Sequence, residues 1–132
     1  MTADARVKLS TLWIVIMLNM LYADVLSFLN AEFLRGLLNG YAEGVRITQP
    51  LLVGSALMVE VPIVMVLLSR MLSPTLNRRV NLVAVFLTAA FIIGGGSTRP
   101  HYLVIASIEL LCLAFVLRLA WRLRAEPVAV TG

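Results

Sequence analysis

The sequence predicts an all-α integral membrane protein, a four-helix bundle with both termini in the cytoplasm. Hydrophobic residues make up 61% of the 132-residue chain and the mean hydropathy is +0.96, whereas a soluble domain is about 45–50% apolar. The apolar residues gather in four long runs, and most basic residues lie at alternate ends of these runs. A chain this short could not bury so much apolar surface in a water-soluble core.

Each apolar run is close to the length of a membrane-spanning helix, roughly 20 residues. We place the four spans at residues 9–29, 50–71, 80–95 and 101–123 of a single transmembrane domain. A cleaved signal peptide is the alternative for the first run, but its apolar region would be only about 7–15 residues long. The first run is longer and contains Asn19 and Asp24, so we expect it to remain as a span. The tail, residues 125–132, is expected to be disordered.

Side chains suited to helix ends flank the predicted spans. Thr48 is expected to cap the second span, since its hydroxyl can accept a bond from a free backbone N–H. Pro50 follows in the first turn, where the missing N–H has no cost. The same chemistry assigns further ends: Ser73-Pro74 closing the second span, Asn77 capping the third, and Ser97 or Thr98 capping the fourth.

Between the first two spans, apolar residues recur at helical spacing. Phe33, Leu34, Leu37 and Leu38 alternate with Glu32 and Arg35 before Asn39-Gly40. This pattern favours a short helix lying in the membrane interface and ending at the Asn-Gly pair. A polar loop without helix is the alternative.

The positions of the basic residues predict the orientation. Cytoplasmic loops of membrane proteins carry an excess of Lys and Arg. Eight basic residues fall on the side of the chain termini: Arg6, Lys8, Arg70, Arg78, Arg79, Arg118, Arg122 and Arg124. The opposite side carries three: Arg35, Arg46 and Arg99. Both termini are therefore expected inside.

The remaining composition points away from several function classes. The formal charge is +4, but charged residues are only 14% of the chain and form no continuous basic face, so nucleic acid is not an expected partner. Cys112 is the only cysteine and His101 the only histidine, which makes a metal site unexpected. No soluble catalytic motif is present, so we expect neither an enzyme nor a bound cofactor.

Three carboxyl residues lie within the predicted spans: Asp24, Glu60 and Glu109. A rise of about 1.5 Å per residue places them roughly 9, 18 and 12 Å below the outer ends of their helices. All three share one layer if their helices turn the same way, and Asn19 and Tyr22 are expected to line it. No basic residue lies at this depth, so the three carboxyls are not expected to be ionised together.

Two interpretations of this layer remain open. Ionisable groups inside a membrane often bind a proton, a metal ion or a cationic ligand. Alternatively, neutral carboxyls form hydrogen bonds between helices and only hold the bundle together. Pro62, two residues after Glu60, removes one helical hydrogen bond and predicts a kink in the second span.

A series of small residues on the third span predicts a helix-packing surface, because small side chains let membrane helices approach closely. The residues assigned to this surface are Ala84, Thr88, Ala90 and Gly94.

Several segments resemble a family of small bacterial four-helix membrane proteins of unknown function. The segments are residues 19–27 (NMLYADVLS), 60–70 (EVPIVMVLLSR), 77–81 (NRRVN) and Ile108-Glu109. The resemblance implies the bacterial inner membrane, but it brings no activity with it.

Two functional hypotheses follow, both with the lipid bilayer as a partner. The first is a small proton- or cation-coupled transporter using the carboxyls, working as a homodimer because four short helices enclose little volume. The second is a non-catalytic accessory or assembly subunit of a larger membrane complex. A membrane enzyme or lipid-binding protein ranks third.

Overall fold

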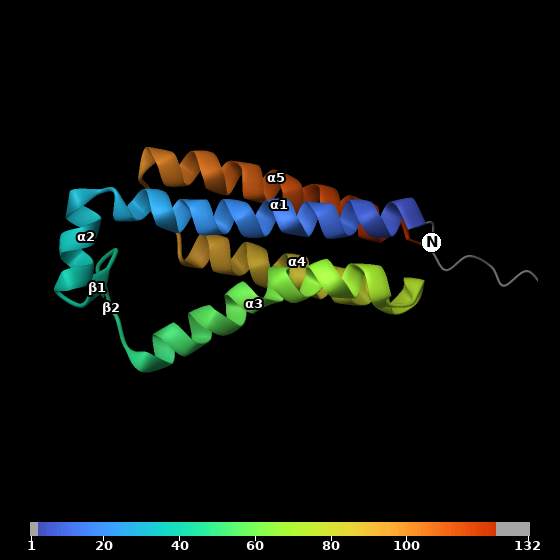
Figure 1. Cartoon of the computed structure of the whole chain (residues 1–132), viewed down its shortest axis with the longest axis horizontal. Coiled ribbons are helices and arrows are strands. Elements are labelled where there is room, and N and C mark those ends of the chain that lie inside the picture. The colour runs from blue at the N-terminus through green and yellow to red at the C-terminus, as the bar shows by residue number, and fades with distance from the viewer. Residues whose placement is uncertain (1–2, 124–132) are drawn as a thin grey trace, which may run out of the picture.

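The computed structural model describes residues 3–123 and contains four long helices, one short helix and a small hairpin (Figure 1). Their bounds are α1 Ala3–Phe28, α2 Ala31–Leu38, β1 Tyr41–Ala42, β2 Val45–Arg46, α3 Gln49–Met71, α4 Pro74–Gly94 and α5 Pro100–Arg122. The helices α1, α3, α4 and α5 are each long and apolar enough to cross a membrane. The predicted all-α four-helix membrane architecture is confirmed. The predicted disordered tail, residues 125–132, lies outside the described residues.

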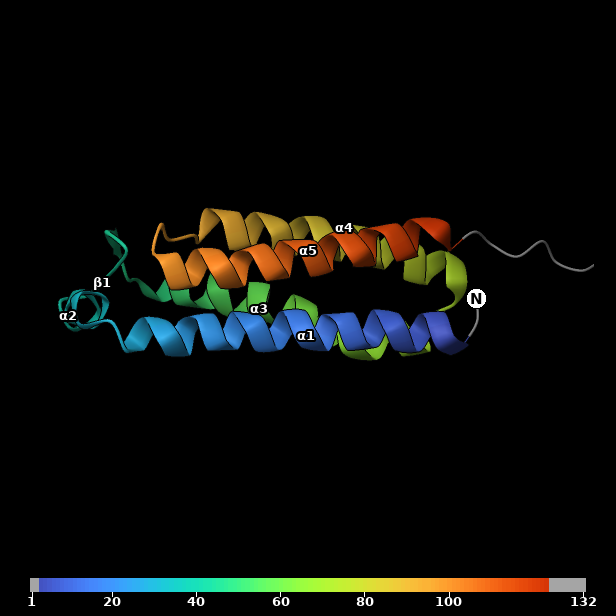
Figure 2. The same cartoon turned by 90° about the horizontal axis from the view of Figure 1, so that it is seen from above.

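The four long helices run side by side in alternating directions (Figures 1 and 2). Helix α1 packs against α3 and α5, and α4 packs against the same two helices. Thus α1 and α4 lie diagonally across the bundle. We call the end where α1 begins and α5 ends the terminal end. The opposite end carries α2 and the hairpin, and we call it the hairpin end.

The short segment at the hairpin end is partly helical, as predicted. The side chain of Asn30 accepts a bond from the N–H of Phe33 and starts α2, which ends at Asn39. The residues after α2 form an antiparallel hairpin, which the sequence analysis did not predict. Its turn residues, Glu43 and Gly44, have φ angles of 47° and 80°, the positive values that a tight two-residue hairpin turn requires.

Two of the long helices start earlier than predicted. Helix α1 begins at Ala3, and its first turns carry an ion pair of 2.9 Å between Lys8 Nζ and Asp4 Oδ2. Helix α4 begins at Pro74 and not near residue 80. Proline is common both in the first turn of a helix and just after the end of one. Here Pro74 is the first residue of α4, directly after Ser73. A helix can extend beyond the membrane, so the apolar run alone does not give its bounds.

The predicted cap of α3 is confirmed, whereas the caps predicted for α4 and α5 are wrong. Thr48 Oγ1 accepts from the N–H of Leu51 at 3.3 Å and caps α3, with Pro50 in its first turn. Asn77 lies inside α4 and is fully buried. Helix α5 starts after Arg99 without a side-chain cap. The hydroxyl of Ser97 accepts from the N–H of Arg99 instead and so stabilises the preceding loop.

Helix α3 packs against the bundle over only part of its length. Its buried residues, Pro62, Met65 and Ser69, all belong to its second half. Residues 49–54, at the hairpin end, are all exposed, and this half of α3 diverges from the other helices (Figure 1). Pro62 lies inside the helix, where it removes a backbone hydrogen bond and permits a bend. The bundle is therefore more closely packed at the terminal end.

Candidate functional site

Glu109 is the buried carboxyl residue of the bundle. It lies on the face of α5 that also buries Ile105, Leu113 and Val116, and only 2% of its surface is exposed. Its Oε1 atom has no hydrogen-bond partner among residues 3–123. Buried polar atoms are nearly always satisfied, so an unpartnered carboxyl oxygen in the interior marks a position able to receive a proton, an ion or a polar ligand.

Asp24 lies on α1, the helix that packs against α5, which carries Glu109. It follows the buried Ala23 on α1 but is itself exposed. On the same helix as Glu109, the hydroxyl of Tyr102 donates to the carbonyl of Ile92 on α4 at 2.8 Å. Two of the three carboxyls predicted from the sequence thus lie on neighbouring helices, Asp24 on α1 and Glu109 on α5, and we call them the carboxyl pair.

Helix α4 contributes a second unsatisfied polar group to the interior. Thr88 is 1% exposed, and its Oγ1 has no hydrogen-bond partner within residues 3–123. A threonine in a helix commonly donates to the carbonyl four residues earlier, but Thr88 does not. Thr88 and Glu109 therefore present free polar atoms from two adjacent helices.

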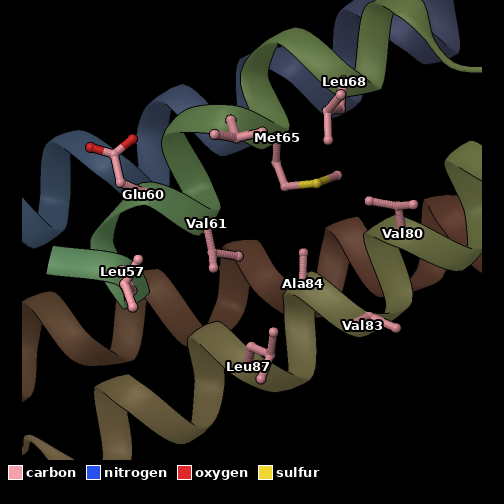
Figure 3. A pocket seen from close by; sticks show the side chains of 10 residues that line it. Leu57, Glu60, Val61, Met65, Leu68, Val80, Val83, Ala84 and Leu87 are labelled. Atoms are coloured by element: carbon pink, nitrogen blue, oxygen red, sulfur yellow. The ribbon is translucent and has the colours of Figure 1, made fainter. Parts of the chain in front are cut away.

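Glu60 does not join this pair. It is exposed and lies at the rim of an apolar groove of about 290 Å³ between α3 and α4. In Figure 3 its carboxyl points away from Val61 and Ala84, which line the groove. The prediction of one shared layer requires all three carboxyls to face the interior of the bundle. Glu60 does not meet this condition, because it lies on the outward face of α3.

The two other predicted lining residues also lie apart from the carboxyl pair. The side-chain amide of Asn19 donates to the carbonyl of Val15 in its own helix at 2.8 Å. Tyr22 is 60% exposed on the outer surface of α1.

The residues assigned to helix packing divide into two groups. Ala84 and Thr88 are buried in the bundle, whereas Ala90 and Gly94 face outward. A methyl group added at Gly94 would meet no atom within 4 Å. The outer pair leaves room for close approach by another helix or by lipid.

A buried polar network at the terminal end was not predicted. The indole Nε1 of Trp13 donates to Oδ1 of Asn81 at 2.8 Å, and the amide of Asn81 donates to the carbonyl of Asn77 at 2.8 Å. Asn77 Nδ2 donates in turn to the carbonyl of Ser69 at 2.7 Å. These bonds link α1, α4 and α3. The available signal was the spacing of Asn77 and Asn81, four residues apart on one helix face.

A second set of bonds joins α1 to α3 at the same end. Ser10 Oγ donates to the carbonyl of Val66 at 2.9 Å and accepts from Arg70 Nε at 3.3 Å. Arg6 Nη1 donates to the carbonyl of Arg70 at 2.9 Å. The terminal end is therefore closed by hydrogen bonds, whereas the half of the bundle that contains Asp24 lacks the packing of α3.

Charged residues at the hairpin end hold the extramembrane segment. Arg99 Nε pairs with Glu43 Oε1 at 2.9 Å, and Arg99 Nη1 lies 3.7 Å from Glu32 Oε2. The hydroxyl of Ser97 also donates to Glu43 Oε1 at 3.1 Å. These contacts connect the start of α5 with both α2 and the hairpin turn.

The arrangement suits a small ligand held by few groups. Within residues 3–123, no three His, Cys, Asp or Glu side chains are grouped so as to hold a metal ion. Asp24 and Glu109, on neighbouring helices, are the carboxyl groups that this arrangement offers.

Comparison with known proteins gives one match. The sequence model of a family described as a family of unknown function (DUF6326) matches residues 2–130. No curated protein and no solved structure matches the chain.

Proposed function

The chain belongs to the DUF6326 family of unknown function, and we propose that it is a small proton- or cation-coupled transporter. Its binding site is the carboxyl pair of Asp24 and Glu109. The observation that carries the proposal is the buried Oε1 of Glu109, which has no hydrogen-bond partner within residues 3–123. An ionisable group at membrane depth has a cost of at least about 2.5–3.5 kcal/mol on insertion scales. A role in binding accounts for its presence better than packing does.

The electrostatics of the pair support binding of a proton or cation. The salt bridges formed within residues 3–123 all lie at the two ends of the bundle, so no basic side chain neutralises Asp24 or Glu109. Two carboxylate charges that lie close together repel each other strongly where the dielectric constant is low. A proton or a cation between them removes that repulsion. Binding of one would therefore release the other, which is the coupling that an exchanger needs.

The asymmetry of the bundle supports access from the hairpin end. Residues 49–54 of α3 are exposed, and so is Asp24 on α1. The terminal end is closed by the bonds of Trp13, Asn81 and Asn77. In this proposal the described conformation receives its ligand from the hairpin side. Release to the other side requires the terminal network to open, as alternating access demands.

The proposed location is the bacterial inner membrane, with both termini in the cytoplasm. Eight of the eleven basic residues of the chain fall on the terminal side, as expected for the cytoplasmic side of a membrane protein. The ligand then enters from outside the cell. The proposed role moves an ion without making or breaking covalent bonds, so the protein is not an enzyme in this account.

The test is a proton-release titration of the purified chain in detergent with Na⁺, K⁺, Mg²⁺ and a lipophilic phosphonium cation. The expected result is proton release with at least one cation in the wild type, and none in Glu109→Gln. Glu60→Gln is the matched control, because it makes the same chemical change on the outward face of α3. The transporter proposal fails if the folded wild type releases no protons, or if both variants behave alike.

A second candidate function, an accessory subunit, is favoured by the position of Glu60. A carboxyl on an outward face, beside an apolar groove lined by Leu57, Val61 and Ala84, would be satisfied by a polar or basic group on a partner helix. A homodimer would meet the same need. In this account Glu60→Leu stays folded but lowers the mass of the native complex, whereas Glu109→Gln leaves that mass unchanged. An unchanged mass in Glu60→Leu argues against it.

A further inference from the structure

A second groove lies on the outer surface of the bundle, between the start of α1 and the end of α5. Its volume is about 520 Å³. Its walls are apolar toward the middle of the membrane and basic toward the terminal end. Leu12 and Phe115 line the part toward the middle, and Lys8, Arg118 and Arg122 line the part toward the terminal end, where Leu119 lies between the two arginines.

The two arginines of this groove are not engaged elsewhere. Arg118 and Arg122 are exposed, and neither takes part in a salt bridge within residues 3–123. They lie four residues apart on α5, so their side chains share one helix face. Lys8 reaches the same groove from α1, although it also pairs with Asp4 at 2.9 Å. The groove therefore carries three cations and one neighbouring carboxylate.

Three other basic residues at this end have partners. Arg6 donates to the carbonyl of Arg70, and Arg70 donates to Ser10. The guanidinium of Arg78 lies 5.0 Å from the centre of the Trp121 ring. Within residues 3–123, the groove between α1 and α5 thus gathers two arginines that form no ion pair, whereas Arg79 is exposed singly on α4.

We propose that this groove binds an anionic phospholipid of the leaflet at the terminal end. The phosphate would lie between Arg118, Arg122 and Lys8, and an acyl chain would run along Phe115 and Leu12. Basic pockets between membrane helices at the cytoplasmic side recognise anionic headgroups. Arginine suits this role because its planar guanidinium binds phosphate oxygens in pairs.

The chemistry of the groove selects a lipid over other phosphate ligands. A free phosphate ion would use the basic rim but not the apolar wall, which is continuous with the hydrocarbon region. A zwitterionic lipid would bring a cationic headgroup into a site that already has an excess of positive charge. The anionic lipid satisfies both parts of the groove. The site is independent of the carboxyl pair, because its residues lie at the other end of α1 and α5.

The experiment is native mass spectrometry of the full chain in neutral detergent, titrated with phosphatidylglycerol or phosphatidylcholine of the same acyl chains. We expect phosphatidylglycerol to bind with at least about tenfold preference, since each basic residue near an anionic headgroup contributes about 1 kcal/mol, or roughly fivefold. The double variant Arg118→Gln/Arg122→Gln loses the preference. Arg79→Gln, an exposed arginine at the same end of α4, retains it.

Three results would overturn the proposal. The first is equal binding of the two lipids by the wild type. The second is equal loss of preference in the double variant and in Arg79→Gln, which would indicate attraction by net charge alone. The third is displacement of the lipid by millimolar inorganic phosphate, which would indicate a phosphate-ion site. If the double variant does not fold, the test is the change in melting temperature of the wild type on addition of each lipid. An equal change with both lipids would contradict the proposed site.

Discussion

The indole nitrogen of Trp13 donates a hydrogen bond to Oδ1 of Asn81 across the interior of the bundle, with 2.8 Å between the nitrogen and the oxygen. This bond joins α1 to α4, the two helices that lie diagonally opposite and do not pack directly. Both side chains are fully buried. The bond therefore fixes the relative position of two helices that are otherwise connected only by their packing against α3 and α5.

Removal of this donor is predicted to destabilise the bundle. In Trp13→Phe a smaller aromatic ring replaces the indole, and Oδ1 of Asn81 loses its partner in a buried site. We expect a loss of about 1 kcal/mol in the free energy of unfolding, the size of a typical hydrogen bond between membrane helices. Reversible unfolding in mixed micelles measures it. Trp121→Phe is the control, because Trp121 is 63% exposed, and an equal loss there would contradict the prediction.

Asn77 is predicted to hold the short connection between α3 and α4. Its amide donates to the carbonyl of Ser69, and its own carbonyl accepts from Asn81. Asn77→Ala removes the first of these bonds, and we expect faster hydrogen exchange around residues 69–73 together with a lower melting temperature. Thr75→Ala, at an exposed position of the same helix turn, should change neither. Exchange that rises equally in both variants would show that the connection does not depend on Asn77.

Arg99 is predicted to order the hairpin with little effect on global stability. Its two ion pairs, with Glu43 and Glu32, are partly exposed, and such pairs contribute about 0.2–1 kcal/mol. Arg99→Gln should therefore increase hydrogen exchange in Tyr41–Ala42 and Val45–Arg46 without a large change in melting temperature. Arg35→Gln, on the exposed surface of α2, is the control. Unchanged exchange in Arg99→Gln would contradict the assigned role.

The orientation of the chain is a prediction that labelling can test. In a Cys112→Ser background, Asn39→Cys places a thiol at the hairpin end and Ser73→Cys places one at the terminal end, both at exposed positions. The distribution of basic residues predicts that a membrane-impermeant maleimide labels Asn39→Cys in intact cells. Ser73→Cys should react only after permeabilisation. The reverse pattern would place the termini outside.

The sequence predicts the spans well because their signal is local. A run of apolar residues and its length suffice for a membrane helix, and the cap at Thr48 depends only on the residues beside it. The start of α4 was predicted wrongly because Pro74 is compatible with both the end of one helix and the start of the next. The hairpin was missed because Glu43 occupies a turn position with positive φ, where Gly, Asn or Asp is the usual signal.

The site was only partly predictable because depth and direction are separate properties. The depth of Asp24, Glu60 and Glu109 follows from the rise per residue, but the direction of each side chain depends on which helices pack together. Helix α3 meets the bundle through Pro62, Met65 and Ser69, and this contact turns Glu60 outward. Trp13 illustrates the same difficulty: its place near a span end is typical of an interfacial anchor, yet it is buried and bonded to Asn81.

The central claim, that Glu109 is the proton- or cation-binding carboxyl, is tested most directly by infrared difference spectroscopy. The measurement follows the carbonyl stretch of protonated carboxylic acids when the cation identified by titration is added to the reconstituted protein. Our account predicts a loss of this band in the wild type and in Glu60→Gln, and no change in Glu109→Gln. A band that still responds to the cation in Glu109→Gln, or one that does not respond in Glu60→Gln, would contradict the account.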